Sequence, residues 1–226
     1  MRPLIIAIDG PSGAGKGTVA RAVAHRLQYR HLDTGAMYRA VAWKAVHDGL
    51  ALDDEDSIAD IAERASLDVT DDSVRIDGED VTRAIRTPQI DRAAALVARL
   101  PGVRIALVRR QREEGRDGGI VVEGRDIGTV VFPDAGVKIY LDASSEERAR
   151  RRAADPAHGV GRQAALADVE NELKARDFSD STRRDSPLMI APDAVVLDTT
   201  QLSVPEAVER VLAEVEKVKG KLETRN

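Results

Sequence analysis

A glycine-rich segment near the start of the chain has the residue types and spacing of a phosphate-binding loop. It follows a short apolar run, precedes a helical pattern, and consists of Gly10, Pro11, Ser12, Gly13, Ala14, Gly15, Lys16, Gly17 and Thr18. The spacing matches G-x-x-x-x-G-K, with the hydroxyl residue one place later than in the strict form. Glycines let backbone N–H groups turn towards phosphates, and Lys16 can reach the terminal phosphates from the start of the helix. We therefore expect a nucleotide-binding loop, and an ordinary glycine-rich turn with a surface lysine is the alternative.

Arginines form the second group of candidates. Of the 34 basic residues, 27 are Arg and 7 are Lys, and a guanidinium can grip phosphate with two parallel hydrogen bonds. Arg148 and Arg152 are four residues apart and share one helix face. Arg176 and Arg183 are seven apart and share a face two helical turns long. Solvated ion pairs, for example with Asp180, and a general bias towards Arg are the alternatives.

A phosphate-binding loop alone does not distinguish a GTPase, an ATPase motor and a small-molecule kinase. The sequence contains no Asn-Lys-x-Asp motif for guanine, which weighs against a GTPase. The additional Gly17 before Thr18 resembles the loops of nucleoside-monophosphate kinases, which read Gly-Lys-Gly-Thr or Gly-Lys-Gly-Ser.

Four further motifs resemble those of the bacterial cytidylate kinases of type 1, in the same order. They are HLDTGAMYR at 31–39, EGRDIGTVVFPDA at 123–135, KIYLDA at 138–143, and a C-terminal signature with Arg176-Asp177, Asp180, Arg183 and Pro187-Leu188. The similarity covers almost the whole chain, including an inserted lobe that the shorter monophosphate kinases lack. It implies ATP-dependent phosphorylation of CMP and dCMP to the diphosphates, with Mg²⁺, in pyrimidine nucleotide metabolism.

The resemblance also assigns roles to individual residues. It puts Thr34 and Arg39 in the acceptor-binding segment, Arg148 and Arg152 beside a short lid over ATP, and Arg176 and Arg183 at the acceptor phosphate and the transferring phosphoryl group. The acceptor is a phosphate dianion, whose second pKa is about 6, so the reaction needs no general base. Catalysis then consists of aligning two polyanions and neutralising their charge. The predicted catalytic residues are Lys16, Arg148, Arg152, Arg176 and Arg183.

The nucleotide implies a magnesium ion. The Thr18 hydroxyl and several waters would be its ligands. The sequence leaves open which carboxylate orients those waters, with Asp9, Asp33 and Glu123 as the candidates. The four histidines have no metal-like spacing.

Recognition of cytosine requires an acceptor facing the exocyclic amine and a cationic donor facing N3 and O2. Asp126 could accept from the amine, with Arg104 or Arg125 as the donor; alternatively, Arg125 and Asp126 form a structural ion pair. Ala95 stands where relatives usually carry a Ser that helps to hold the base, which leaves more of the binding to Arg104. The predicted substrate-binding residues are Thr34, Arg39, Arg104, Arg125, Asp126, Arg176, Asp180 and Arg183.

Apolar patterns predict elements that would position these residues. Short apolar runs at 3–8, 29–32, 120–122, 137–141 and 194–197 predict strands that alternate with helices. This alternation predicts an α/β fold with a mostly parallel sheet covered by helices on both faces. Thr34 is expected to cap a helix that ends near His47. Capping boxes are expected at Ser144/Glu147 and Ser203/Glu206, with the last helix ending at Gly220.

Residues 51–119 have a different pattern, with a helical stripe, two alternating segments around Asp77-Gly78, and two further helices that begin at Thr87-Pro88 and Pro101. We therefore expect a core of residues 1–34 and 118–226, which contains a lid at 150–163, and an inserted acceptor-binding lobe at 35–117.

Composition limits the other possibilities. The 226 residues include no Cys, six aromatic residues and a net charge of −5. The missing Cys excludes disulfides and thiolate metal sites, and the acidic charge argues against a general nucleic-acid binder. We expect a cytoplasmic monomer that binds small molecules and neither nucleic acid nor membranes. A kinase of UMP or AMP, and a P-loop regulatory or nucleic-acid-associated ATPase, are the competing functions.

Overall fold

A five-stranded parallel sheet forms the centre of the molecule. The computed structural model describes residues 3–155 and 166–224. The strands are β1 (Ile5–Asp9), β2 (Arg30–Asp33), β6 (Ile120–Gly124), β7 (Val137–Asp142) and β8 (Val195–Asp198), in the order β2-β6-β1-β7-β8. Every neighbouring pair is parallel. The predicted α/β class is confirmed, and all five strands end at the same edge of the sheet.

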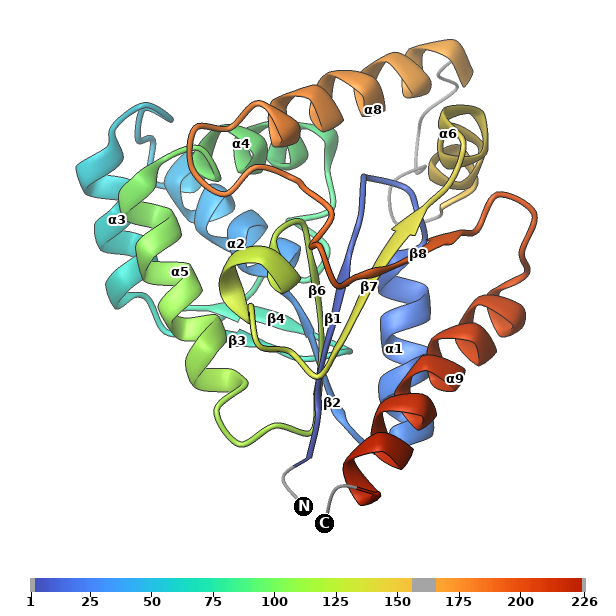
Figure 1. Cartoon of the computed structure of the whole chain (residues 1–226). Coiled ribbons are helices and arrows are strands. Elements are labelled where there is room, and N and C mark those ends of the chain that lie inside the picture. The colour runs from blue at the N-terminus through green and yellow to red at the C-terminus, as the bar shows by residue number, and fades with distance from the viewer. Residues whose placement is uncertain (1–2, 156–165, 225–226) are drawn as a thin grey trace.

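Helices cover both faces of this sheet (Figure 1). Ile6 and Ile8 pack in one cluster with α1 (Lys16–Leu27) and α9 (Val204–Glu223). Ala7, between them in the sequence, belongs to the cluster on the opposite face with α2 (Thr34–His47) and α5 (Pro101–Glu114). The central strands β6, β1 and β7 are largely buried on both faces, which explains their mainly apolar composition, whereas the edge strands β2 and β8 are partly exposed.

The inserted segment has the helices and the hairpin expected for it. It contains α3 (Glu55–Arg64), the antiparallel strands β3 (Leu67–Val69), β4 (Val74–Ile76) and β5 (Glu79–Asp80), and the helices α4 (Pro88–Val97) and α5. Asp77 and Gly78 connect β4 and β5 with φ angles of 50° and 83°. Two successive positive φ angles are typical of a tight hairpin turn.

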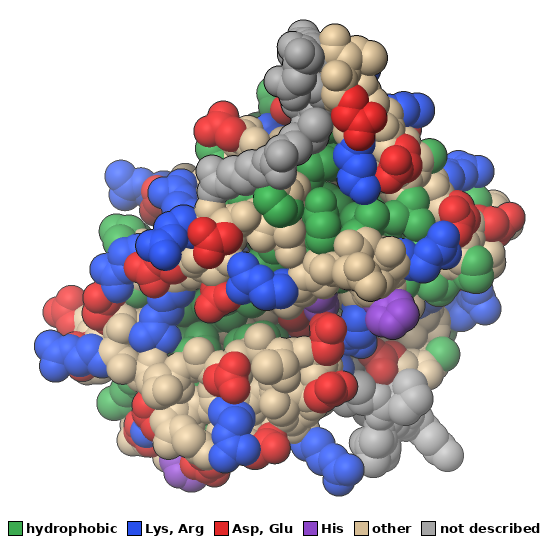
Figure 2. All heavy atoms as spheres, turned by 90° about the horizontal axis from the view of Figure 1, so that it is seen from below, with side chains coloured by type: hydrophobic (Ala, Val, Ile, Leu, Met, Phe, Trp, Pro, Cys, Tyr) green, Lys and Arg blue, Asp and Glu red, His purple; other side chains and the backbone are tan. Residues whose placement is uncertain are grey.

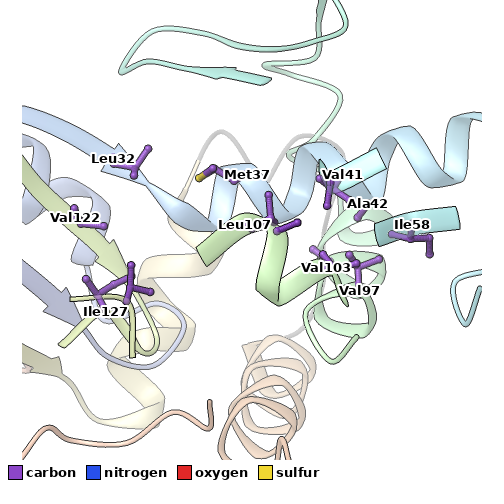
Figure 3. Packing of buried hydrophobic residues seen from close by; sticks show 14 of the residues in the cluster. Leu32, Met37, Val41, Ala42, Ile58, Val97, Val103, Leu107, Val122 and Ile127 are labelled. Carbon is purple, nitrogen blue, oxygen red and sulfur yellow. The ribbon is translucent and has the colours of Figure 1, made fainter. Parts of the chain in front are cut away.

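One apolar cluster joins the inserted helices to the sheet, and Figure 3 shows how it is continuous. Side chains from the sheet side of the cluster lie at one end of the view, and those of α2 to α5 lie at the other. Met37 of α2 and Leu107 of α5 lie between the two groups. At the sheet end the labelled residues are Leu32, Val122 and Ile127. At the end formed by the helices they are Val41, Ala42, Ile58, Val97 and Val103.

The remaining elements lie at or near the carboxyl edge of the sheet. A single turn of π-helix, η1 (Ile127–Val131), follows β6, and α6 (Ser145–Ala154) follows β7. The helix α8 (Leu166–Ser181) packs along α6 at that edge (Figure 1). Most of the lid predicted at 150–163, including Gly159 and Gly161, lies outside the described residues.

Three predictions about helix ends need correction. The N-cap of α2 is Asp33, whose side chain accepts from the Ala36 N–H, while the Thr34 hydroxyl donates to the Glu123 carbonyl. Ser144 caps α6, but Glu147 does not complete a capping box, because its carboxylate binds arginines of the same helix. The last helix continues past Gly220 to Glu223. The capping box at Ser203 and Glu206 is confirmed.

The surface seen from below carries charges of both signs. Figure 2 shows Lys and Arg side chains interspersed with Asp and Glu over that face. Within residues 3–155 and 166–224, no helix is both long enough and apolar enough to cross a membrane.

Candidate active site

The glycine-rich loop lies between the end of β1 and the start of α1, as predicted. Gly10 has a φ of 148°, and a Cβ there would lie 2.0 Å from the backbone oxygen of Leu141 on β7. Only glycine can bring the loop this close to the neighbouring strand. Gly15 precedes α1 in a left-handed conformation, and no side chain caps the helix. The N–H groups of the first turn of α1 are therefore not capped by a protein side chain, which is the arrangement that suits an anion.

Lys16 is buried in this loop with its ammonium group close to the backbone. Its side chain is almost fully enclosed, and Nζ donates to the Pro11 carbonyl at 2.7 Å. Burial, followed by the positive charge of Arg125, lowers the pKa of Lys16 to about 7. A bound phosphate would supply the missing counter-charge. The geometry fits a lysine that is built to meet an anion.

Arginines with unused N–H groups surround the same space. A cavity of about 790 Å³ extends from the glycine-rich loop past α2, α4 and the end of β6 to α8. In the described part of the chain, five buried side-chain nitrogen or oxygen atoms have no hydrogen-bond partner. Three of them belong to arginines that line this cavity, namely Nε of Arg39, Nε of Arg176 and Nη2 of Arg183. Unpartnered buried donors are costly, so their convergence here fits a site for a polyanion.

Arg125 and Asp180 form an ion pair in the middle of the cavity wall. Arg125 Nε donates to Asp180 Oδ2 at 2.8 Å. Burial alone would raise the pKa of Asp180, but the charges of Arg125, Arg176 and Arg183 outweigh it and hold the pKa below its usual value. Asp180 therefore stays ionised and keeps three cations close together.

Arg104 and Asp126 form a second buried pair, at the α5 side of the cavity. Arg104 Nη2 donates to Asp126 Oδ2, and Nη1 donates to the Tyr38 hydroxyl at 3.2 Å. The guanidinium carbon also lies 5.8 Å from the centre of the Tyr38 ring. Arg125 and Asp126 are adjacent in sequence but have different partners, so they do not form the structural ion pair considered above. Ala95, on α4, also lines this cavity.

Arg148 and Arg151 donate to backbone carbonyls of the glycine-rich loop. Arg148 is buried, donates to the carbonyls of Ala143 and Ser12 at 3.1 and 3.0 Å, and pairs with Asp177. Arg151 donates to the Ala14 carbonyl at 3.4 Å and to Thr199. Arg151 was not among the predicted site residues, although its place next to Arg152 on α6 was a usable signal.

The three candidate carboxylates differ in how far their oxygens are engaged. Both oxygens of Asp9 accept backbone N–H groups, from Ile127 at 2.8 Å and Gly128 at 2.7 Å. Burial raises the pKa of Asp9 to about 6 despite these bonds. Asp33 uses one oxygen to cap α2 and the other to bind Arg39 at 2.8 Å.

Glu123 is placed differently. Its Oε1 contacts Nε2 of His31 at 3.2 Å. If Gly17 carried a Cβ, that atom would lie 3.0 Å from the same Oε1. Glu123 therefore faces the turn that carries Thr18, and both residues line the large cavity. Absence of a side chain at Gly17 is what leaves room for the carboxylate.

Comparisons with known proteins agree with this geometry. A family model described as cytidylate kinase matches residues 6–217. A cytidylate kinase of Desulfitobacterium hafniense is 48% identical over 93% of this chain and 91% of that protein. A cytidylate kinase of Desulforamulus reducens is 46% identical over 95% of this chain and 97% of that protein.

Similarity to solved structures extends to more distant kinases. A gluconokinase from Sinorhizobium meliloti superposes with a TM-score of 0.53 at 15% identity, over 100% of this chain and 98% of that one. This likeness supports the fold alone. The family match over most of the chain and the high identity to curated relatives go further: the chain belongs to the cytidylate kinase family.

Proposed function

We infer that the chain catalyses ATP-dependent phosphorylation of CMP, and of dCMP, to the diphosphates. One observation carries the assignment. A single cavity joins the glycine-rich loop to the buried Arg104–Asp126 pair, and the arginines that have unpartnered nitrogens line the same cavity. ATP phosphates bound at the loop account for the first feature, and a nucleotide base bound at the Arg104–Asp126 pair accounts for the second. The negative charge of the phosphoryl group transferred between them accounts for the arginines.

The donor half of the site consists of residues 10–18. Backbone N–H groups of this loop and of the first turn of α1 bind the ATP phosphates, and Lys16 neutralises the phosphate that is transferred. Arg148 and Arg151 keep the loop in shape through its carbonyl groups. Arg152 lines the cavity from α6 and acts on the transferring group.

The acceptor half of the site holds the CMP phosphate among cations. Arg39, Arg176 and Arg183 offer the unpartnered N–H groups, and the Arg125–Asp180 pair fixes their spacing. The acceptor oxygen carries negative charge at neutral pH, so no side chain needs to remove a proton. These residues contribute by aligning the two phosphates and by offsetting charge in the transition state.

Asp126 and Arg104 select the base. Arg104 occupies Oδ2 of Asp126, so Oδ1 can accept from the cytosine amine. Arg104 can donate to O2 or N3 from the same position. Uracil would bring a carbonyl oxygen against the carboxylate and leave both acceptors unpaired, which disfavours UMP. Thr34 contributes a buried hydroxyl oxygen on the α2 side of the cavity.

Mg²⁺ fits the donor set beside the loop. It prefers oxygen ligands, keeps several waters, and takes the rest of its shell from nucleotide phosphates. Thr18 offers a hydroxyl, and Glu123 offers a carboxylate facing Gly17, whereas both oxygens of Asp9 and of Asp33 are engaged. We therefore assign Thr18 and Glu123 to the metal. When bound, the ion offsets charge on the phosphates.

Residues 35–117 serve as the acceptor-binding lobe, and residues 1–34 and 118–226 serve as the core. Support comes from the position of Arg39 and Arg104 on the inserted elements and of the glycine-rich loop on the sheet. The enzyme acts as a cytoplasmic monomer. ATP and CMP are metabolites of the cytoplasm.

Product analysis tests the function directly. Purified protein, ATP, Mg²⁺ and CMP should yield ADP and CDP in equal amounts, separated by ion-exchange chromatography. ADP without CDP would instead indicate a P-loop ATPase, and the same assay with RNA or DNA added would detect stimulation of that activity. The Lys16→Met variant serves as the negative control because it lacks the ammonium group in the loop.

A further inference from the structure

Asp91 lies on α4, in the inserted segment, and binds arginines from two other helices. Its Oδ2 accepts from Nη2 of Arg152 on α6, and its Oδ1 accepts from Nη1 of Arg176 on α8 at 3.3 Å. The Asp91 side chain is 11% exposed and those of the two arginines are 23% and 19% exposed. One carboxylate therefore links three helices that are far apart in the sequence.

Asp91 holds these arginines from the side away from the glycine-rich loop. Arg152 and Arg176 line the large cavity that contains the loop, but Asp91 does not. All three residues line a separate cavity of about 410 Å³ between α4 and α8, together with apolar side chains such as Leu96 and Leu173. Because open space separates the two helices here, packing alone does not fix the guanidinium groups.

The chemistry of the arginine fork allows both contacts at once. Each guanidinium has five N–H donors, so one bond to Asp91 leaves others for phosphate. Nε of Arg176 is buried and unpartnered. Burial and then the charge of Arg125 lower the pKa of Arg176, and the carboxylate of Asp91 opposes that effect. Without the negative charge of Asp91, less of the repulsion between Arg176 and the neighbouring arginines would be offset.

We propose that Asp91 is a positioning residue for phosphoryl transfer, which holds the Arg152 and Arg176 guanidinium groups at one point on the cavity wall and ties the inserted lobe to α6 and α8. The inference rests on the kinase function proposed above. Misplaced arginines still attract phosphate but stabilise the transition state less, so the effect falls on kcat rather than on KM.

Asp91→Asn tests this role because it keeps the shape and removes the charge. At saturating ATP and CMP, kcat should fall about tenfold, while KM for either substrate changes less than threefold. Asp91→Glu, which retains the carboxylate, should recover at least part of this loss. In an Arg152→Ala background, Asp91→Asn should lower kcat less than threefold, because one of the two groups on which Asp91 acts is already missing.

Glu209→Gln is the matched control, since it removes the carboxylate of an exposed ion pair between α9 and Arg26 of α1. It should leave kcat unchanged. The proposal is overturned if Asp91→Asn has kcat within twofold of the parent, or loses the same tenfold in both backgrounds. It is also overturned if Asp91→Glu is no more active than Asp91→Asn. Should Asp91→Asn fail to fold, Asp91→Ala takes its place, with the same expected loss of kcat and the same outcomes that overturn the proposal. A parent protein that does not phosphorylate CMP would refute the proposed function instead.

Discussion

At the scale of single residues, the cost of burying Lys16 has a measurable consequence. The native pKa is about 7 against an ordinary value of 10.5. Below pH 7 the lysine is charged in both the folded and the unfolded chain, so the folded protein bears the full cost of burial. Between pH 7 and 10.5 the folded protein loses the proton first, so its stability rises with pH.

Lys16→Met should therefore stabilise the ligand-free protein while abolishing catalysis. At pH 6 we expect the free energy of unfolding to be about 2 kcal/mol larger than the parent's, which corresponds to a Tm roughly 5 °C higher. We expect kcat to fall at least about a hundredfold. The Tm advantage should shrink as pH is raised towards 10 in calorimetric scans. Near-normal turnover of CMP by the variant would refute the assignment of this loop.

Asp126→Asn examines base selection at the opposite end of the cavity. The amide can donate as well as accept, so it loses its preference for the cytosine amine and tolerates the uracil carbonyl. We expect kcat/KM for CMP to fall at least about tenfold and the CMP-to-UMP ratio to narrow. Asp48→Asn removes a carboxylate that pairs with Lys44 of α2, and it should change neither kcat/KM for CMP nor the CMP-to-UMP ratio. Equal losses with CMP and UMP would mean that Asp126 only supports Arg104.

At the scale of elements, α6 carries arginines with different surroundings. Arg148 gives its N–H groups to the Ala143 and Ser12 carbonyls and to Asp177, whereas Arg152 reaches the wall of the large cavity. The sequence predicted the same catalytic role for both, because residues four apart share a helix face.

Arg152→Ala should lower kcat about a hundredfold with little change in Tm, as expected for a group that acts in the transition state. Arg148→Ala should lower Tm by roughly 5 °C and weaken ATP binding, because it releases the loop carbonyl and removes the cation that pairs with Asp177. Steady-state kinetics and calorimetry on the two variants separate these effects. A normal kcat with a lower Tm for Arg152→Ala would identify the arginine face of α6 as structural.

The elements themselves could be predicted well from the sequence, and the errors are local. Asp33 and Thr34 can both cap a helix, and the outcome depends on a partner 89 residues away, the Glu123 carbonyl that takes the Thr34 hydroxyl. Gly220 lies in open space, so α9 continues through it at the modest cost of a helical glycine, about 1 kcal/mol. Propensity and spacing predict where an element lies, but tertiary contacts decide its last residues.

At the scale of the whole molecule, most of the predicted site residues line one cavity, but the pairs that they form there could not be predicted from the sequence. The glycine-rich loop is continuous in sequence, so its chemistry was visible there. Arg125 and Asp126 are neighbours, yet one pairs with Asp180 of α8 and the other with Arg104 of α5. Asp91 belongs to no motif, and only the meeting of α4, α6 and α8 reveals it.

The most direct test of the account is a comparison of acceptors with ATP as the donor. The rate of ADP release, coupled to NADH oxidation, should be measured with CMP, dCMP, UMP, AMP and GMP. The proposed selection of cytosine by the Arg104–Asp126 pair requires that kcat/KM for CMP exceed the values for UMP and AMP by at least about tenfold, with dCMP also accepted. Preference for UMP or AMP, or ADP release that is independent of any acceptor, would contradict the account.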